Sequence, residues 1–399
     1  MTANNNKPLP LGGVTVVSLE QAVAAPLCTR QLAEQGARVI KVERPGSGDF
    51  ARAYDDRVNG MSSHFVWVNR SKESLALNLK TAEGQDILHR LLAEADVLVQ
   101  NLAPGATARM GLSFAALHQR YPGLIVCDIS GYGEGGPYQD KKAYDLMIQS
   151  ESGFLSITGD PQVEGMAKAG CSVADIAAGM YASNAILSAL LLRGRTGEGS
   201  HIDVSMLESL VEWMGYPMYY SFDGAPPPAR AGASHATIYP YGPFPVGDGT
   251  TVMLGLQNER EWRAFCDAVL ECPELADNPD FIDNSQRSAN RRQLRELIVT
   301  AFAGLTRDEV VRRLDEAGIA NATVNDMALV WRHPQLAARD RWLEVATPAG
   351  PVPALKAPGL WFPEAVSAVP AVGEHSAVIL GELGYPRDQI DHFKSAGVI

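Results

Sequence analysis

The stretches Gly13-Val14-Thr15-Val16-Val17-Ser18-Leu19 and Arg38-Val39-Ile40-Lys41-Val42-Glu43 decide the fold of this chain. Both are short apolar runs, which indicates buried strands. The segment 26–35 between them predicts a helix that ends at Gly36. A strand, a helix and a strand within about thirty residues form a βαβ unit, which predicts a parallel sheet with a right-handed crossover.

The same alternation continues along the chain. We expect strands at 96–101, 124–130 and 201–205, and helices at 83–95, 114–120, 175–192 and 206–220, the last broken near Gly215 and Pro217. The turn after the first strand, 20–26, has no glycine, which argues against a nicotinamide dehydrogenase. Ligands of such sheets collect at the carboxyl ends of the strands, here at loops 101–105 and 131–137. The glycine-rich loop 131–137 could equally be a plain turn.

A proline-rich shift in composition at 223–230 indicates a linker. It divides the chain into a large domain, 1–223, and a smaller domain, 224–330, with a strand-rich part at 239–256. Helices are expected at 259–270, 291–302 and 308–317. Residues 331–399, with a strand at 343–346 and a final helix at 376–383, are expected to return to the large domain. The predicted class is therefore α/β, with a Rossmann-like parallel-sheet large domain built from both chain ends and a smaller α+β domain.

The composition excludes several classes of protein. The chain has 399 residues, 46% hydrophobic and 20% charged, with a formal net charge of −12. Such an acidic chain does not favour nucleic acid or an anionic membrane surface as partner. The polar N-terminus, residues 1–8, has no apolar signal core, and no uninterrupted apolar run is long enough to cross a bilayer. The five cysteines form no CxxC pair, so we expect no metal site. We expect the cysteines to be free, buried thiols, which indicates a cytoplasmic location.

The segment 172–179 places Asp175 between small and apolar residues at the start of a long helix. Spacing alone favours a structural role, with Ser172 or Asp175 capping the helix. The alternative is an ionised carboxylate, held at the positive end of the helix and stripped of water, that acts as a covalent nucleophile. The two interpretations are compatible.

Several further motifs occur in a characteristic order. They are Leu11-Gly12-Gly13-Val14, Val39 to Asp49, Asn69-Arg70-Ser71-Lys72, Leu77-Asn78-Leu79-Lys80, Gln100 to Gly105, Arg193 to Gly199 and Gly373-Glu374-His375. Over essentially its whole length the chain resembles the class III CoA-transferases, a group that includes formyl-CoA transferase and carnitine CoA-transferase. This resemblance implies ring-shaped subunits interlocked as a homodimer. It also implies a coenzyme A (CoA) thioester as substrate and no permanently bound cofactor.

The resemblance also assigns site residues. Asp175 matches the family's nucleophile, which forms an anhydride with the acyl group and then a β-aspartyl thioester with CoA. The matching CoA-binding residues are Val23, Ala24, Arg44, Leu77, Asn78, Leu79, Lys80, Asn101, Leu102, Ala103, Arg109, Lys142, Ala143, Tyr144 and Asp145. The basic members of this set fit the phosphates of CoA, which an acidic protein must meet with local cations.

The stretch 215–217, the segment around His235 and the stretch 255–262 are most similar to the branch that acts on branched dicarboxylates of four to five carbons. The expected substrates are of the mesaconate, itaconate or succinate type. Transfer could be intramolecular, between C1 and C4 of mesaconyl-CoA, or intermolecular. His235, with Arg52 and Arg230 as rivals, is the candidate partner of the substrate's second carboxylate. The glycine run that forms a lid in relatives is missing from 224–245.

Two alternatives remain at this point. Racemases of 2-methylacyl-CoA belong to the same superfamily but use a His-Asp pair where this chain has Tyr144-Asp145. Because tyrosine has a pKa near ~10, it is a poor proton shuttle at neutral pH. The other alternative is a non-catalytic CoA-binding protein in which Asp175 is structural.

Overall fold

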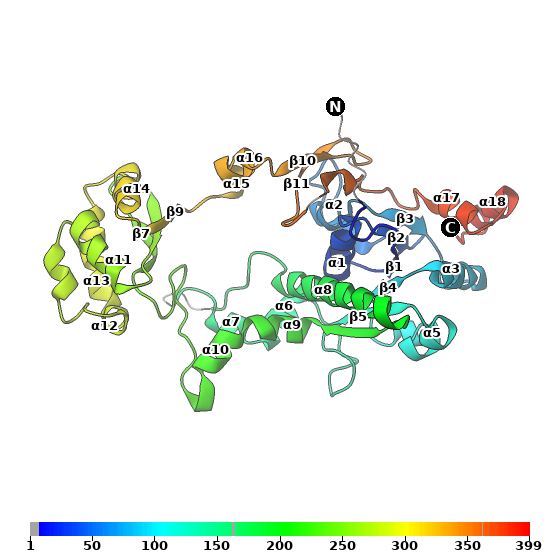
Figure 1. The fold of residues 1–399 in the computed structure, drawn as a ribbon, viewed down its shortest axis with the longest axis horizontal. Coiled ribbons are helices and arrows are strands. Elements are labelled where there is room, and N and C mark those ends of the chain that lie inside the picture. Colours follow the sequence, from blue (N-terminus) through cyan, green and yellow to red (C-terminus); the bar gives the residue numbers. More distant parts are fainter. Residues whose placement is uncertain (1–7, 162, 164, 361) are drawn as a thin grey trace. The chain divides into compact units, whose positions relative to one another are not determined.

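The computed structural model describes residues 8–161, 163, 165–360 and 362–399 (Figure 1). The polar N-terminal tail, residues 1–7, lies outside the described residues. The chain forms two compact units. Unit 1 contains Met1–Ser152, Ala169–Met214 and Ala338–Ile399, and unit 2 contains Gly153–Lys168 and Gly215–Ala337.

The division between the units falls at Met214 and Ala337, whereas the composition shift had suggested 223 and 330. The proline-rich stretch 223–230 is a loop within unit 2. The Gly153–Lys168 segment also belongs to unit 2, because the guanidinium of Arg230 donates to the backbone carbonyls of Leu155, Ser156 and Gly165. These contacts join residues far apart in the sequence, which composition cannot reveal.

Unit 1 is built on a six-stranded sheet in the order β3-β2-β1-β4-β5-β6. All five strand pairs are parallel, so the predicted parallel sheet is confirmed. The strands are β1 (Thr15–Leu19), β2 (Arg38–Glu43), β3 (Glu73–Ala76), β4 (Val97–Gln100), β5 (Ile125–Ser130) and β6 (His201–Ser205). The edge strand β3 was not predicted, because its four residues are too few to show an alternating pattern.

Helices cover both faces of the sheet. Those of the first part of the chain are α1 (Ala24–Ala33), α2 (Ser63–Asn69), α3 (Ala82–Glu94), α4 (Ala106–Arg109), α5 (Phe114–Arg120), α6 (Asp145–Glu151), α8 (Val173–Thr196) and α9 (Met206–Trp213). Val17, Ile40 and Leu98 share one core cluster with Ile87 and Leu91 of α3. Helices α1 and α8 pack against each other and against the strands.

The C-terminal residues complete unit 1. Here the structure forms the hairpin β10 (Trp342–Val345) and β11 (Val352–Leu355), then α17 (Ser376–Glu382) and α18 (Arg387–Ser395). The predicted final helix is α17, but it is not the last, because the amphipathic α18 follows and buries Ile390 and Phe393. These residues cover the edge strand: the Ala76 N–H donates to Ser376 Oγ at 3.0 Å, and the Asn78 N–H donates to the Val398 carbonyl at 2.7 Å.

Unit 2 is an α+β unit. Its sheet is antiparallel, with β7 (Tyr241–Pro245), β8 (Thr251–Gly255) and β9 (Ala320–Thr323) in that order. Its helices are α7 (Phe154–Ile157), α10 (Gly215–Tyr220), α11 (Glu259–Ala264), α12 (Asn284–Ala289), α13 (Arg291–Phe302), α14 (Arg307–Glu316) and α15 (Met327–Trp331), and α16 (Pro334–Ala338) lies at the boundary. One core cluster of aromatic and aliphatic side chains, including Trp262, Phe265 and Phe302, joins these elements.

Within the described residues, α8 is long and apolar enough to cross a membrane by length and composition. This helix packs against α1, α9, β5 and β6, and 33% of its apolar window is buried within the described chain. All five cysteines are free. Cys28, Cys127 and Cys266 are buried, but Cys171 is exposed, so the prediction of uniformly buried thiols is wrong at that position.

Candidate active site

Asp175 lies in the first turn of α8, at its third residue. Its side chain is half-buried among small apolar neighbours, including Ala174 and Ala178. Burial raises the pKa of this carboxyl from its ordinary value of 3.8 to about 7, and the charge of Asp145 adds to the effect. A carboxylate whose pKa is raised in this way is poorly hydrated, and therefore more nucleophilic once it ionises.

The N-terminus of α8 is capped from another helix. The side chains of Ser172 and Asp175 do not cap it: Ser172 makes no capping hydrogen bond, and Asp175 lies inside the helix. Instead the Ala174 N–H donates to Asp145 Oδ1 at 2.8 Å. Ser172 occupies the predicted N-cap position, but the expected capping bond from the side chain of Ser172 or Asp175 is not formed, because the acceptor lies 29 residues earlier in the chain.

Gln149 holds Asp145 in this position. Its Nε2 donates to Asp145 Oδ2 at 2.6 Å, and its Oε1 accepts from the Ala169 N–H at 2.9 Å. Gln149 is fully buried. Asp145 thus has both carboxylate oxygens engaged and faces the first turn of α8.

The first turn of α1 lies close to the same face of α8. A Cβ on Gly179 would come within 2.6 Å of the Ala24 carbonyl oxygen, so the two helices touch through this glycine. Asp175 and Gly179 are four residues apart in α8 and therefore lie on one face of it. Helix α1 has no side-chain cap, and the N–H groups of Ala24 and Ala25 have no acceptor in the described part of the chain. Two free backbone donors thus lie at the helix start that packs against this face.

The turn that leads into α1 is held by a buried charge cluster of Glu20, Lys41, Asp49 and Lys72, which we call the buried quartet. Lys72 Nζ contacts Glu20 Oε1 at 2.7 Å, and Lys41 Nζ contacts Asp49 Oδ2 at 2.8 Å. Burial would raise the pKa of Glu20, but the two lysines outweigh it and lower that pKa to about 2. Because Asp49 Oδ1 also accepts from the Ala22 N–H, and Lys72 donates to the Pro26 carbonyl, the quartet fixes both ends of the turn.

Tyr54 is a candidate site residue that the sequence did not reveal. Burial raises the pKa of its hydroxyl, and the charges of Asp49 and Asp175 add to this effect. The influence of Asp175 indicates that Tyr54 lies near the candidate nucleophile. Its ring lies edge-on to His64, with 5.3 Å between the ring centroids. Tyrosine is too common on protein surfaces for the sequence alone to single out this one.

Four predicted CoA-binding residues are exposed cations: Arg44, Lys80, Arg109 and Lys142. Each lies in the segment that follows a different strand, after β2, β3, β4 and β5 respectively. Neighbouring parallel strands end at the same edge of the sheet, so these segments start from one edge. Within the described residues, none of the four side chains makes a hydrogen bond or ion pair with another part of the chain, which leaves them available for phosphates.

The remaining predicted CoA-binding residues differ in what they expose. Val23, Ala24 and Leu77 are buried and offer a ligand only their backbone, whereas Leu79 and Leu102 pack against the core. Asn101 is structural in part, because it exchanges hydrogen bonds with the backbone of Gln21. Half-buried Asn78 contacts the C-terminal residues. Ala103 and Tyr144 are exposed, and half-buried Ala143 lies close to Gly131.

The three candidate partners of a substrate carboxylate also differ. Arg52 donates to both oxygens of Glu43 and to the Pro370 carbonyl, and each guanidinium nitrogen of Arg230 donates to a backbone carbonyl. His235, in unit 2, accepts the backbone N–H groups of Thr237 and Ile238 at Nδ1. The proton of a neutral His235 must therefore be on Nε2, which is left as a donor.

Comparison with known proteins agrees with this geometry. Residues 11–376 match the family described as CoA-transferase family III. The chain is 34% identical to the succinate–glutarate CoA-transferase of Agrobacterium fabrum, covering 96% of this chain and 98% of that protein. It is 33% identical to the succinyl-CoA:mesaconate CoA-transferase of Haloarcula marismortui, covering 94% of this chain and 96% of that protein.

Solved structures give the same result. A CaiB/BaiF family protein from Brucella suis superposes with a TM-score of 0.81 at 34% identity, covering 94% of this chain and all of that one. Rv3272 from Mycobacterium tuberculosis superposes with a TM-score of 0.82 at 27% identity, covering 94% of this chain and all of that one. The chain therefore belongs to CoA-transferase family III, as an enzyme whose substrate is a CoA thioester.

Proposed function

We propose that this enzyme moves CoA between the carboxylates of dicarboxylic acids of four to five carbons, with Asp175 as the covalent nucleophile. The observation that carries the proposal is Asp175 itself, half-buried in the first turn of α8 with its pKa raised to about 7. At slightly alkaline pH such a group is largely ionised yet poorly solvated, which is what attack on a thioester requires.

The proposed reaction proceeds in balanced steps. A carboxylate oxygen of Asp175 forms a bond to the thioester carbonyl carbon, and the carbon–sulfur bond breaks, giving a mixed anhydride and a CoA thiolate. The thiolate then attacks the aspartyl carbonyl and releases the donor acid as its carboxylate. The acceptor carboxylate reverses both steps, so the energy of the thioester bond is retained and no net proton is consumed.

Neighbouring groups support these steps. The unpaired N–H groups of Ala24 and Ala25 are suited to stabilise an oxyanion on a carbonyl attacked near the start of α1. Asp145 fixes the first turn of α8 through the Ala174 N–H. Arg44, Lys80, Arg109 and Lys142 are the proposed ligands of the CoA phosphates, because each is a solvated cation without a partner in the described chain.

Detection of the covalent intermediate tests the proposal. The enzyme is incubated with succinyl-CoA, and its intact mass is compared with that of Asp175→Asn. We expect a CoA adduct on the wild type that maps to the peptide with Asp175 and is released by hydroxylamine, and no adduct on the variant. Ser172→Ala, whose hydroxyl makes no capping bond, is the matched control and should form the adduct. An adduct on Asp175→Asn, or none on the wild type, would reject the scheme.

The dicarboxylate assignment rests on the relatives named for succinate, glutarate and mesaconate. We propose that the Nε2–H of His235 binds the carboxylate that does not react, and we favour it over Arg52 and Arg230, whose donors are engaged within the chain. His235→Ala should raise the KM for dicarboxylate acceptors at least about tenfold and leave adduct formation from acyl-CoA intact. Unchanged acceptor KM values would remove His235 from the site.

A mesaconate-type substrate, itaconate and citramalate are the acceptors to compare first. If transfer is intramolecular, mesaconyl-C1-CoA should convert to the C4 thioester without incorporating labelled free mesaconate. Label in the product would show intermolecular transfer. Exchange of the α hydrogen with deuterated water, tested with a 2-methylacyl-CoA, would instead indicate racemase chemistry.

We also propose an interlocked homodimer of ring-shaped subunits, in the cytoplasm, where charged CoA thioesters are retained. Exposed apolar side chains support a partner surface. Met180, Leu191 and Leu192 of α8 are at least half exposed, and in α10 Tyr219 is 82% exposed. On each of the two helices, apolar groups exposed to this extent are typical of a surface that another chain covers. Light scattering should give twice the monomer mass of 42.9 kDa.

A further inference from the structure

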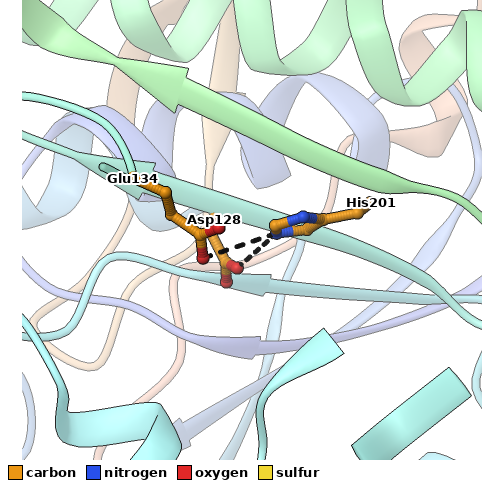
Figure 2. Close-up of side chains that lie close together, drawn as sticks. All are labelled: Asp128, Glu134 and His201. Atoms are coloured by element: carbon orange, nitrogen blue, oxygen red, sulfur yellow. Dashed lines mark hydrogen bonds and ion pairs between the residues drawn. The ribbon is translucent and has the colours of Figure 1, made fainter. Parts of the chain in front are cut away.

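A second cluster of chemically active side chains lies on the strands β5 and β6 and in the turn that follows β5. Asp128 Oδ2 is 2.8 Å from His201 Nε2, and Glu134 Oε1 is 4.0 Å from the same nitrogen. All three ligand atoms lie within 4.8 Å of one another. Figure 2 shows the two carboxylates turned toward one edge of the imidazole. The mechanism proposed above uses none of these residues.

The side chains of Asp128 and His201 are held in place by their surroundings. Gln100 Nε2 donates to Asp128 Oδ1 at 2.7 Å, which leaves Oδ2 facing His201. The ring of His201 stacks on Phe114, with 5.0 Å between centroids and 9° between the planes. Partners that orient metal ligands in this way are typical of metal sites.

The turn that carries Glu134 is also fixed. The Gly133 N–H donates to Ser130 Oγ at 2.8 Å, and the Glu134 N–H donates to Asp203 Oδ2 at 2.9 Å. The backbone of this turn is thus bound to side chains of β5 and β6, although the Glu134 side chain is 69% exposed. The Glu134 carboxylate can therefore approach the other two ligands from a turn whose backbone is already ordered.

The charges in this region are not balanced. Asp128, Glu134 and Asp203 bring three carboxylates together, and in the described part of the chain no lysine or arginine forms an ion pair with any of them. The only basic group among them is His201. Carboxylates gathered without a lysine or arginine favour a bound cation, since a divalent ion would neutralise two of the charges.

We propose that Asp128, Glu134 and His201 bind one divalent transition-metal ion, with zinc as the expected ion. An imidazole nitrogen with two carboxylate oxygens suits zinc or cobalt, whereas magnesium and calcium prefer oxygen ligands alone. Cysteine and histidine spacing led us to expect no metal, but Asp128 and His201 are 73 residues apart and meet only through strand pairing. The ion would fasten the turn that precedes Lys142 and take no part in the transfer chemistry.

Metal titration of the full-length enzyme tests this site. The protein is stripped with a chelator and titrated with Co²⁺, whose visible absorption reports the ligand geometry, and then with Zn²⁺ as competitor. We expect one saturable site in the wild type, displacement by Zn²⁺, and a melting temperature that rises with the metal. Asp128→Asn and His201→Ala should both lose the cobalt spectrum.

Two further variants keep the test decisive. His118→Ala removes a second imidazole that also stacks on Phe114 but lies outside the cluster, so it should bind Co²⁺ like the wild type. Glu134→Gln changes an exposed side chain, so it should fold normally and bind at least about tenfold more weakly. The proposal would be overturned if the wild type did not bind Co²⁺, or if His201→Ala bound Co²⁺ like the wild type. It would also be overturned if Mg²⁺ raised the melting temperature as much as Zn²⁺ does. These readouts are independent of adduct formation at Asp175.

Discussion

Asp145 acts on Asp175 in two ways at the level of single residues. Its Oδ1 accepts the Ala174 N–H and so fixes the first turn of the helix that carries Asp175. Its charge also helps to raise the pKa of Asp175, after the larger effect of burial. One carboxylate thus fixes the position of its neighbour and adds to the rise of its pKa.

Removing that charge should change the pH profile. Asp145→Asn keeps an oxygen that can accept the Ala174 N–H, loses the acceptor for Gln149 Nε2, and no longer disfavours ionisation of Asp175. Because the nucleophile must be ionised, wild-type kcat should rise as pH increases through about 7, and the variant's rise should move to lower pH by on the order of one unit. Initial rates measured across this range decide the question.

Glu151→Gln provides the control for this measurement. It removes a negative charge from the same helix, α6, but Glu151 pairs with Lys141, 2.5 Å away, and does not contact Asp145. Its pH profile should match that of the wild type. A shift to higher pH in Asp145→Asn would contradict the assigned electrostatics.

The contact between α1 and α8 has its own consequence at the level of elements. Gly179 lies one helical turn beyond Asp175, where no side chain fits against the Ala24 carbonyl. Gly179→Ala should therefore push the helices apart, costing about 1–3 kcal/mol of unfolding free energy and lowering kcat more than it raises KM. Urea unfolding and steady-state kinetics would measure both.

Gly194→Ala is the matched substitution in the same helix. A Cβ at Gly194 would meet nothing within 4 Å, so the better helix propensity of alanine should leave stability unchanged or raise it by up to about 1 kcal/mol. Equal effects of the two substitutions would show that the close approach of α1 and α8 does not constrain the site.

The sequence predicted elements better than it predicted contacts. Arg38–Glu43, Phe114–Arg120, His201–Ser205 and Arg291–Phe302 have the predicted bounds, because their apolar periodicity is strong and capping or turn residues end them. The cap of α8 by Asp145 and the meeting of Asp128 with His201 depend on tertiary contacts that have no local signature.

Net charge sets the conditions for CoA binding by the whole molecule. A protein with a formal charge of −12 repels a polyphosphate at long range, so affinity must come from close contacts to the few exposed cations at the sheet edge. Lys142→Gln should raise the KM for acyl-CoA about tenfold with little change in kcat. Kinetics with a full CoA ester and with a pantetheine thioester would check this, since only the full ester should respond.

Salt gives an independent check on the same contacts. The KM of the wild type should rise with ionic strength, and that of Lys142→Gln should rise less steeply, because one charge contact is already lost. Lys356, which is paired with Asp340, offers a comparison: Lys356→Gln should keep the wild-type salt slope. Parallel slopes for all three proteins would remove Lys142 from the phosphate site.

The contacts of β3 with residues 375–398, which lie some three hundred residues later in the chain, determine when this protein can fold during synthesis. Ser74, Ala76 and Asn78 bond to His375, Ser376 and Val398, so residues 375–398 must be synthesised before the outer strand acquires its cover. Until then apolar side chains of the sheet are exposed to solvent, so we expect chaperones to bind the growing chain. Deletion of residues 375–399 should therefore yield insoluble product rather than a shortened enzyme.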